Sequence, residues 1–185
     1  TRTVAIGETG QVGKEHFTLV VRAMLRLANT VFLHGCSGAN LDCIAREVFW
    51  KKRLNFNHGT GHGVGYLLNI HEGPISFRWK EGKTPSQIFE KNMVITDEPG
   101  IYMKDSHGIR IENELLVTEA DRNEYGQFMK FEVLTLVPID LDALLPEQMT
   151  SEEREQLNNY HQLVYEKISP YLPEAEREWL KYYTR

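Results

Sequence analysis

The chain has 185 residues, of which 41% are hydrophobic and 25% charged, a composition typical of a soluble globular domain with a sizeable core. The net charge is −5 and the basic residues are scattered, which argues against a nucleic-acid partner because such partners need a clustered basic face. Two cysteines are too few for a disulfide framework, and no apolar run approaches the ~20 residues that span a bilayer, so we expect a reducing, cytoplasmic location and no membrane partner.

The first part of the chain is expected to contain two amphipathic helices. Residues 1–6 are rich in β-branched side chains and predict a short strand, which a glycine-punctuated loop follows. Apolar residues then recur at three- and four-residue steps from 14 to about 33, which is typical of one helix face, and His34-Gly35 is expected to end this helix. The same spacing predicts a second helix over about 41–52, with Asn40 as its N-cap.

Strands are expected to dominate the middle of the chain. Apolar and β-branched residues predict three strands, over residues 92–97, 108–118 and 131–139. Glu98-Pro99-Gly100 is expected to form a turn after the first of them. We also expect a short strand over 67–70 and a mobile polar connection over 77–86. Together with the helices, these strands predict an α+β fold in which a curved antiparallel sheet carries helices on one face.

The tail of the chain is predicted to be helical. Thr150-Ser151-Glu152-Glu153 matches a capping box, in which the threonine hydroxyl and the last glutamate each bond the other residue's backbone N–H. This helix is expected to continue to about Ile168, because Pro170 and Pro173 then interrupt the pattern. A last short helix is predicted over 174–183.

A glycine-rich stretch with three histidines lies between the predicted helices and strands. Residues 57–65 read NHGTGHGVG and residues 71–74 read HEGP, so the glycine density argues against a helix. His58 and His62 are four apart, but Gly59 occupies the position of the general-base glutamate in the helical HExxH motif. The glycines also fail the dinucleotide and P-loop patterns. A nucleotide site is therefore disfavoured.

Two later segments supply carboxylates. Glu98 ends an apolar strand before Pro-Gly, where a carboxylate is poorly solvated unless it has a cation. Arg110 and Glu112 are two apart on a predicted strand and share a face, whereas Ile109 and Ile111 face the core. A histidine with two strand-borne carboxylates is a ligand set suited to Mn²⁺, Fe²⁺, Co²⁺ or Zn²⁺.

Four motifs, in a specific order, carry a resemblance to a known family. They are HGTGHGVG, HEGP, DEPG and GIRIEN, at residues 58–65, 71–74, 97–100 and 108–113. With residues 131–139 they resemble the metallopeptidase domain of the Xaa-Pro aminopeptidases (aminopeptidase P), which belong to the pita-bread (creatinase/aminopeptidase-like) family with prolidase and methionine aminopeptidase. The tail resembles the C-terminal extension of the long form. The resemblance implies a partial catalytic domain over 1–148 and a helical extension over 149–185.

The resemblance also implies a metal centre. His62 matches the imidazole ligand, Glu98 a carboxylate ligand that also takes a proton from the attacking water, and Glu112 the carboxylate that bridges both metals. The family uses two divalent ions, commonly Mn²⁺, which share a water or hydroxide and polarise the scissile carbonyl. The implied reaction removes the N-terminal residue that precedes proline, so the implied partners are peptides with proline at the second position.

Three further residues receive catalytic roles from the same resemblance. His58 and His71 match the two histidines that contact substrate and steady the tetrahedral intermediate. Arg110 matches the arginine at the edge of the site that helps to hold the catalytic carboxylates. The long form is commonly a homodimer, which makes a homodimer a further expectation.

Two family ligands lie outside this sequence. They are aspartates on an upstream hairpin, the second within Asp-x-Thr-Arg-Thr, and this chain opens at Thr1-Arg2-Thr3. Two divalent ions carry four positive charges, of which Glu98 and Glu112 balance half. We therefore expect an N-terminally truncated fragment that by itself binds metal weakly and has no useful peptidase activity.

Other interpretations stay open at this point. A pita-bread module that has lost catalysis could bind peptide or protein, and within the enzyme class prolidase and methionine aminopeptidase are alternatives. HEGP and the tail favour the Xaa-Pro form. Asp97 and Glu114 are expected to be structural, and four isolated histidines are expected to be ordinary surface or core residues: His16, His34, His107 and His161.

Overall fold

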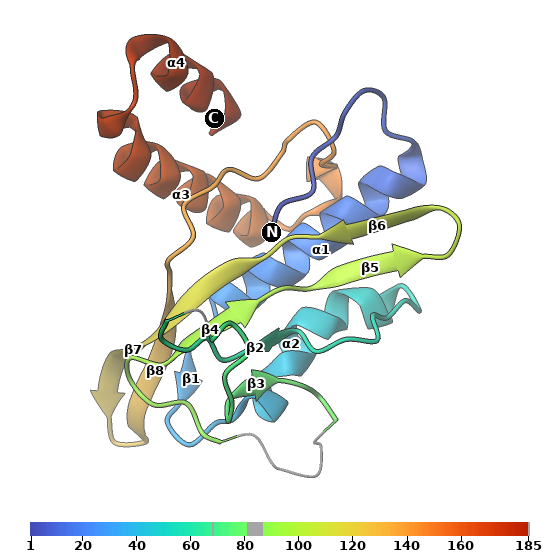
Figure 1. Ribbon diagram of the computed structural model, residues 1–185. Helices are drawn as coiled ribbons and strands as arrows, with labels where there is room; N and C mark the ends of the chain where they lie inside the picture. Colours follow the sequence, from blue (N-terminus) through green and yellow to red (C-terminus); the bar gives the residue numbers. More distant parts are fainter. Residues whose placement is uncertain (68, 81–86, 185) are drawn as a thin grey trace.

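The structure is a computed structural model that describes residues 1–67, 69–80 and 87–184. A curved antiparallel sheet forms one layer and helices cover one of its faces (Figure 1). The main sheet has the strand order β1-β8-β7-β4, with the bounds Phe32–Leu33, Gly126–Val133, Asn113–Asn123 and Val94–Asp97. Each of its neighbouring pairs is antiparallel. This arrangement confirms the predicted α+β fold with a curved antiparallel sheet.

Two short hairpins complete the strand layer. β2 (Gly61–His62) pairs with β3 (Ser76–Phe77), and β5 (Gly100–Met103) pairs with β6 (His107–Arg110). A bridge between Gly63 and Ile95 ties the glycine-rich segment to β4. The motif-bearing segments therefore lie next to one another, although they are far apart in sequence.

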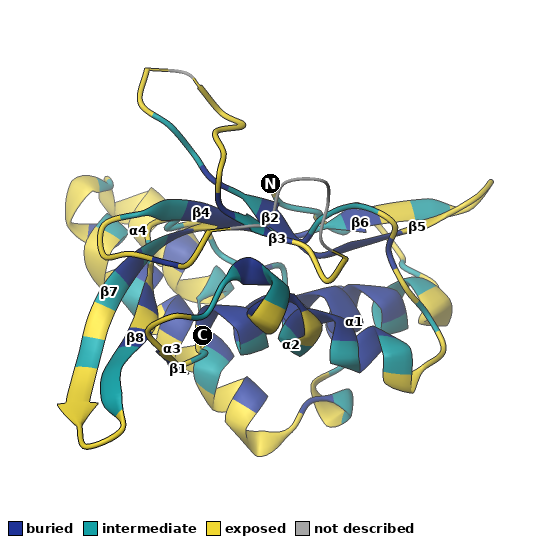
Figure 2. Ribbon diagram, turned by 90° about the horizontal axis from the view of Figure 1, so that it is seen from below, coloured by how far each residue is buried: buried dark blue, intermediate teal, exposed yellow. Residues whose placement is uncertain are grey.

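The described residues form four α-helices: α1 Gln11–Ala28, α2 Gly38–Lys51, α3 Ser151–Ile168 and α4 Glu174–Tyr183. Two 3₁₀ turns, Pro146–Gln148 and Ser169–Tyr171, flank α3. Figure 2 shows α1 and α2 beneath the strand layer, with the buried residues of both layers facing each other. None of the helices within the described residues combines the length and the apolar character that crossing a membrane requires.

The core explains the alternation seen in the sequence. Ile109 and Ile111 are buried, as the strand parity predicts, and they join the same core as Val20, Met24 and Leu27 of α1.

The predicted capping box of α3 is also confirmed. Thr150 Oγ1 accepts from the Glu153 N–H at 3.1 Å, and the Glu153 carboxylate accepts from the Thr150 N–H at 2.8 Å.

Several predictions for the first part of the chain were wrong. The strand expected over residues 1–6 is absent. The first helix ends at Ala28 rather than near residue 33, because Asn29 turns its side-chain amide back to the Leu25 carbonyl and the chain then enters β1. The second helix starts at Gly38 with Ser37 as the N-cap, and Asn40 sits three positions into the motif, where its side chain accepts from the Ser37 N–H at 2.8 Å.

The predicted strands also changed. The strand expected over 108–118 is two strands, because the chain leaves β6 after Arg110 and joins the main sheet only at Asn113. The strand expected over 131–139 is β8, which ends at residue 133 and starts at Gly126, whose φ of +131° suits glycine. Glu98 and Pro99 link β4 to β5 directly instead of forming a turn.

Two predictions fall partly on residues outside the described ones. The strand expected over 67–70 is absent at positions 67, 69 and 70, and position 68 lies outside the described residues. Of the polar connection expected over 77–86, positions 81–86 lie outside the described residues.

Candidate metal centre

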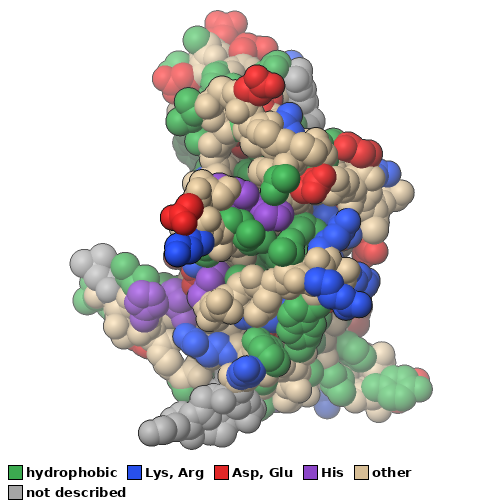
Figure 3. All heavy atoms as spheres, turned by 90° about the vertical axis from the view of Figure 1, so that its right-hand side faces the viewer, with side chains coloured by type: hydrophobic (Ala, Val, Ile, Leu, Met, Phe, Trp, Pro, Cys, Tyr) green, Lys and Arg blue, Asp and Glu red, His purple; other side chains and the backbone are tan. Residues whose placement is uncertain are grey.

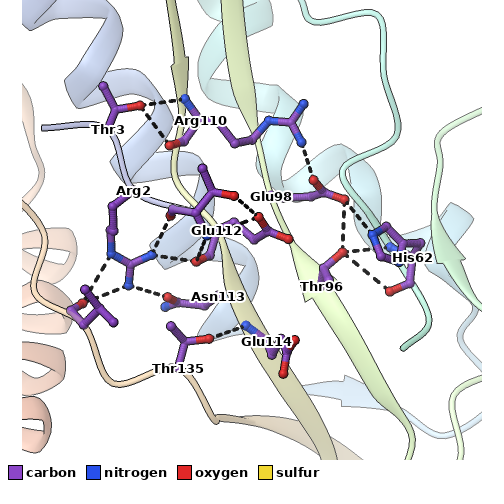
Figure 4. Close-up of polar contacts among 12 residues, drawn as sticks. Arg2, Thr3, His62, Thr96, Glu98, Arg110, Glu112, Asn113, Glu114 and Thr135 are labelled. Atoms are coloured by element: carbon purple, nitrogen blue, oxygen red, sulfur yellow. Dashed lines mark hydrogen bonds and ion pairs between the residues drawn. The ribbon is translucent and has the colours of Figure 1, made fainter. Parts of the chain in front are cut away.

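Three predicted ligands converge on one point. Each of His62, Glu98 and Glu112 offers a ligand atom, and these atoms lie within 4.8 Å of one another. Their side chains come from β2, from the end of β4 and from the break between β6 and β7, and they point toward one another in Figure 4. The His62 Nε2 atom is 3.3 Å from Glu98 Oε1. The geometry on which the peptidase interpretation depends is thus present in the structure.

His62 is placed by the close approach of β2 to β4. The His62 N–H donates to Thr96 Oγ1 at 3.0 Å, and the Glu98 N–H donates to the Thr60 carbonyl at 2.7 Å. Glycine is needed at position 61, because a Cβ there would lie 1.8 Å from the Thr96 carbonyl oxygen. The glycine-rich motif therefore allows the imidazole and the carboxylate to meet.

Replacing Gly61 with alanine is expected to lower the free energy of unfolding by about 1–3 kcal/mol, the usual cost of overpacking. The added methyl group would meet backbone that cannot rotate away. Urea unfolding measures the change. Gly10→Ala is the control, since a Cβ at Gly10 has no neighbour within 4 Å and the expected cost stays below about 1 kcal/mol. Equal effects of the two changes would contradict the assigned close approach.

The backbone also selects the free nitrogen of two histidines. The Nδ1 atoms of His62 and His58 lie 2.9 Å and 2.7 Å from the carbonyl oxygens of Gly63 and Gly59, so we assign the ring proton to Nδ1 in both. Nε2 of His62 then offers a lone pair, as a metal ligand must. Burial lowers the pKa of His58, and Arg110 acts in the same direction, while the Gly59 carbonyl opposes them. His58 is therefore neutral, and its buried Nε2 has no hydrogen-bond partner among the described residues.

The Glu98 carboxylate has three cationic or polar neighbours. One of its oxygens faces His62 and accepts from Thr96 Oγ1 at 3.1 Å, and the other accepts from the Arg110 guanidinium. Arg110 also donates to the Tyr102 hydroxyl at 3.0 Å, which fixes the guanidinium beside the carboxylate. The contact agrees with the role that the resemblance implied for Arg110.

Glu112 is held by the first residues of the chain. The Thr1 hydroxyl donates to its carboxylate, and the Thr1 ammonium lies 3.2 Å from the same oxygen. Burial by itself would raise the pKa of Glu112, but the contacts with Thr1 and the charge of Arg110 outweigh it, so the pKa is lowered. An ionised carboxylate is the form that binds a metal ion.

The two predicted substrate histidines lie at the margin of this cluster. The ring of His71 is exposed and its centroid lies 4.3 Å from that of His62. His58 packs against Tyr102, with 5.7 Å between the ring centroids, and the Tyr102 hydroxyl in turn accepts from Arg110. In Figure 3, histidine side chains form two groups on the face shown, and Lys and Arg side chains lie beside them. All six predicted site residues thus belong to one contiguous region.

The remaining predictions concern neighbouring side chains. Asp97 is fully buried, and burial, followed by the nearby carboxylates of Glu98, Asp42 and Glu112, raises its pKa well above the ordinary value. Glu114 is exposed. Of the isolated histidines, His34 is exposed, and the other three are buried or half-buried: His16, His107 and His161.

Sequence reasoning missed the residues that support the ligands. Thr96 lies in β4 two positions before Glu98, which directly follows the strand, so parity could have predicted that their side chains share a face. Thr1 and Arg2 were noted only as the end of a family motif, and their contacts with Glu112 could not be predicted because they join residues more than 100 positions apart. Figure 4 shows Arg2 and Thr3 beside the segment from Arg110 to Asn113.

The donor set fits a divalent metal ion. An imidazole with a free lone pair and two carboxylates within 4.8 Å of one another match borderline divalent cations. Glu98 already forms an ion pair with the Arg110 guanidinium, which shows that positive charge is favourable beside this carboxylate.

Two family descriptions match the chain. Residues 1–119 match Metallopeptidase family M24, and residues 127–185 match the C-terminal region of peptidase M24. The probable Xaa-Pro aminopeptidase P of Paracoccidioides brasiliensis (strain Pb03) is 38% identical over 188 residues, which is 98% of this chain and 30% of that protein. Aminopeptidase P1 of Arabidopsis thaliana is 39% identical over 186 residues, 98% of this chain and 28% of that protein. The chain therefore spans about 30% of the length of these curated relatives.

Solved structures agree with the sequence matches. The crystal structure of X-prolyl aminopeptidase from Caenorhabditis elegans, a cytosolic enzyme with a di-nuclear active site, is similar with a TM-score of 0.92 at 36% identity, over 100% of this chain and 30% of that one. Xaa-Pro dipeptidase from Bacillus anthracis is similar with a TM-score of 0.60 at 35% identity, over 78% of this chain and 36% of that one. The family match over residues 1–119, together with these identities, shows that the chain belongs to metallopeptidase family M24.

Proposed function

We propose that the chain is the C-terminal part of the catalytic domain of an Xaa-Pro aminopeptidase, which removes the N-terminal residue preceding proline. The observation that carries the proposal is the convergence of His62, Glu98 and Glu112 within 4.8 Å from three separate motifs. Their order and their surroundings are those that the family resemblance implied. The likeness to a cytosolic enzyme supports a cytoplasmic location.

The curated relatives named above are aminopeptidases, and the structural matches favour a form that has the helical tail. The X-prolyl aminopeptidase matches the whole chain, including α3 and α4, whereas the Xaa-Pro dipeptidase matches 78% of it. We propose that residues 149–185 are the helical extension that distinguishes the long form. The catalytic part then covers residues 1–148.

Each site residue has a task in this proposal. His62, Glu98 and Glu112 contribute three of the ligands for two divalent ions, for which we propose Mn²⁺. When bound, the ions would supply a hydroxide at neutral pH and polarise the scissile carbonyl. Glu98 takes the proton of the attacking water through the oxygen that faces His62, while Arg110 neutralises its other oxygen. His58 and His71, at the margin of the cluster, contact the substrate.

The 185-residue chain alone is expected to bind Mn²⁺ weakly and to cleave Xaa-Pro peptides at no useful rate, because its two ligand carboxylates balance half of the four positive charges. Isothermal titration with Mn²⁺ measures the affinity. Glu112→Gln is expected to abolish the remaining binding, and Glu114→Gln, which changes an exposed residue of the same segment, is expected to leave it unchanged. Two tightly bound ions and normal turnover would contradict this expectation.

The activity itself is tested in a chimera in which this chain replaces the matched 30% of the C. elegans enzyme. We expect the chimera to cleave a peptide with proline at the second position, and not the same peptide with alanine there. Glu98→Gln is expected to lower kcat by about 10²–10⁴-fold, the usual range for a lost general base, and Glu114→Gln to leave it unchanged. A folded, metal-loaded chimera that binds the peptide without cleaving it would support a binding module instead.

A further inference from the structure

The backbone at Glu112 lies where strand pairing is interrupted. β6 ends at Arg110 and β7 begins at Asn113, so Ile111 and Glu112 belong to neither ladder. The Glu112 N–H donates to the Thr1 carbonyl at 3.0 Å. The direction of this carboxylate therefore depends on contacts outside the sheet.

Arg2 supplies the principal contact of this kind. Its Nη1 atom donates to the Glu112 carbonyl at 2.6 Å and to the Thr1 carbonyl at 2.9 Å. Its Nη2 atom donates to Asn113 Oδ1 at 2.6 Å and to the Val137 carbonyl at 2.8 Å. A planar guanidinium with this many acceptors has one orientation, and it fixes Glu112 and Asn113 relative to each other.

Tyr160 of α3 completes the surroundings of Arg2. Its hydroxyl accepts from Arg2 Nη2 at 2.6 Å and donates to the Val137 carbonyl at 2.7 Å. Burial raises the pKa of Tyr160, and the positive charge of Arg2 only partly opposes this, so the phenol keeps its proton and can donate. The side chain is 7% exposed, and its hydroxyl is therefore held in a dry position.

We propose that Tyr160 is a positioning residue for the metal centre: through Arg2 it sets the backbone of Glu112 and thereby the direction of that carboxylate. The assignment rests on the proposed role of Glu112 as a metal ligand. It gives the C-terminal region a role in the reaction besides packing. The Tyr160 hydroxyl, 48 residues after Glu112 in the chain, holds the Arg2 side chain that supports the Glu112 backbone.

The contacts support a specific role for the hydroxyl. Outer partners of metal ligands are known to change metal affinity by about 10–100-fold when they are removed. Tyr160→Phe keeps the ring and its packing but leaves Arg2 Nη2 with two acceptors in place of three among the contacts named above. We therefore expect Tyr160→Phe to weaken metal affinity by about tenfold, at the lower end of that range, because Tyr160 acts one step further out.

The test is a Co²⁺ titration of the full 185-residue chain followed by visible absorption, combined with hydrogen exchange at the Glu112 N–H of the metal-free chain. In Tyr160→Phe we expect about tenfold weaker Co²⁺ binding and faster exchange at Glu112. Arg2→Lys keeps the charge without the planar fork and is expected to behave in the same way. Tyr171→Phe, at an exposed position after α3, is the control and is expected to match the unchanged chain in both measurements.

Each outcome decides one of the two proposals. A lower unfolding midpoint in Tyr160→Phe, with Co²⁺ affinity and exchange at Glu112 unchanged, overturns the positioning role and leaves a purely structural one. If Tyr160→Phe fails to fold, as far-UV circular dichroism would show, Arg2→Lys carries the same comparison. If Glu112→Gln binds Co²⁺ as tightly as the unchanged chain, the proposed metal site fails, while the exchange rate at Glu112 still tests the link from Tyr160.

Discussion

Replacing Arg46 with alanine is expected to lower the free energy of unfolding by about 3–5 kcal/mol, the usual effect of breaking a buried ion pair. The Arg46 side chain is 1% exposed and that of Asp42 is 0% exposed, with Nε and Oδ2 2.5 Å apart. The guanidinium also donates to the carbonyl oxygens of Phe56 and His58, each at 2.7 Å. Its loss would leave a buried carboxylate unpaired and release the segment that leads to His58.

Urea unfolding measures this effect, with Arg26→Ala as a matched control. Arg26 pairs with Glu47 at 2.5 Å, but both side chains are substantially exposed, so the expected cost is about 0–1 kcal/mol. The double change Asp42→Leu with Arg46→Met removes both charges and is expected to recover part of the loss. Equal costs for Arg46→Ala and Arg26→Ala would show that the buried pair has no special importance.

Acidification from pH 7 to pH 4 is expected to remove about 3 kcal/mol of stability through His161 alone. Burial, assisted by the positive charge of Arg2, lowers the pKa of this histidine from 6.5 to about 4. Above pH 6.5 neither the folded nor the unfolded state binds the proton, so His161 contributes no pH dependence. Between pH 6.5 and about 4 only the unfolded state binds it, and stability falls by about 1.4 kcal/mol for each pH unit.

The measurement compares urea unfolding at pH 7 and pH 4 for the unchanged chain and for His161→Gln. Glutamine can still accept from the Ile139 N–H, which donates to His161 Nε2 at 3.0 Å, but it does not titrate. The pH dependence is expected to be weaker in His161→Gln, since contributions common to both proteins cancel in the difference. His34→Gln, at an exposed position, is expected to keep the full dependence. An unchanged pH dependence in His161→Gln would refute the assignment.

Local sequence patterns predicted the features that depend on near neighbours. The capping box of Thr150 and Glu153 spans three residues and was confirmed. The alternation of Ile109, Arg110 and Ile111 also held, because side chains on an extended backbone alternate whether or not the strand is continuous. Asn40 shows the limit of this reasoning: its residue type indicated a helix start, but both Ser37 and Asn40 take part in the cap, and the pattern did not tell which comes first.

The features that failed or were missed depend on distant partners. The predicted strand over 108–118 is interrupted because its first half pairs with β5 and its second half with β4. The residues around Glu112 do not show which strands these two halves will pair with. Arg46 was missed for another reason: its partners Asp42 and the Phe56 carbonyl are only 4 and 10 residues away, but nothing in the local pattern marks this charged residue as buried. Arg2 and Tyr160 are 158 residues apart.

By itself the sequence determined the class of fold and the family motifs, because residue type, parity and short spacings encode them, and the resemblance carried by those motifs then implied the candidate ligands. Only the tertiary structure decided that His62, Glu98 and Glu112 meet, which nitrogen of His62 is free, and what holds Glu112 at a gap between strands. The physical reason is the distance along the sequence between the residues that interact. Helix caps and strand alternation arise within a few residues, whereas a metal centre and its supports are built by contacts that exist only once the sheet and the helices have packed together.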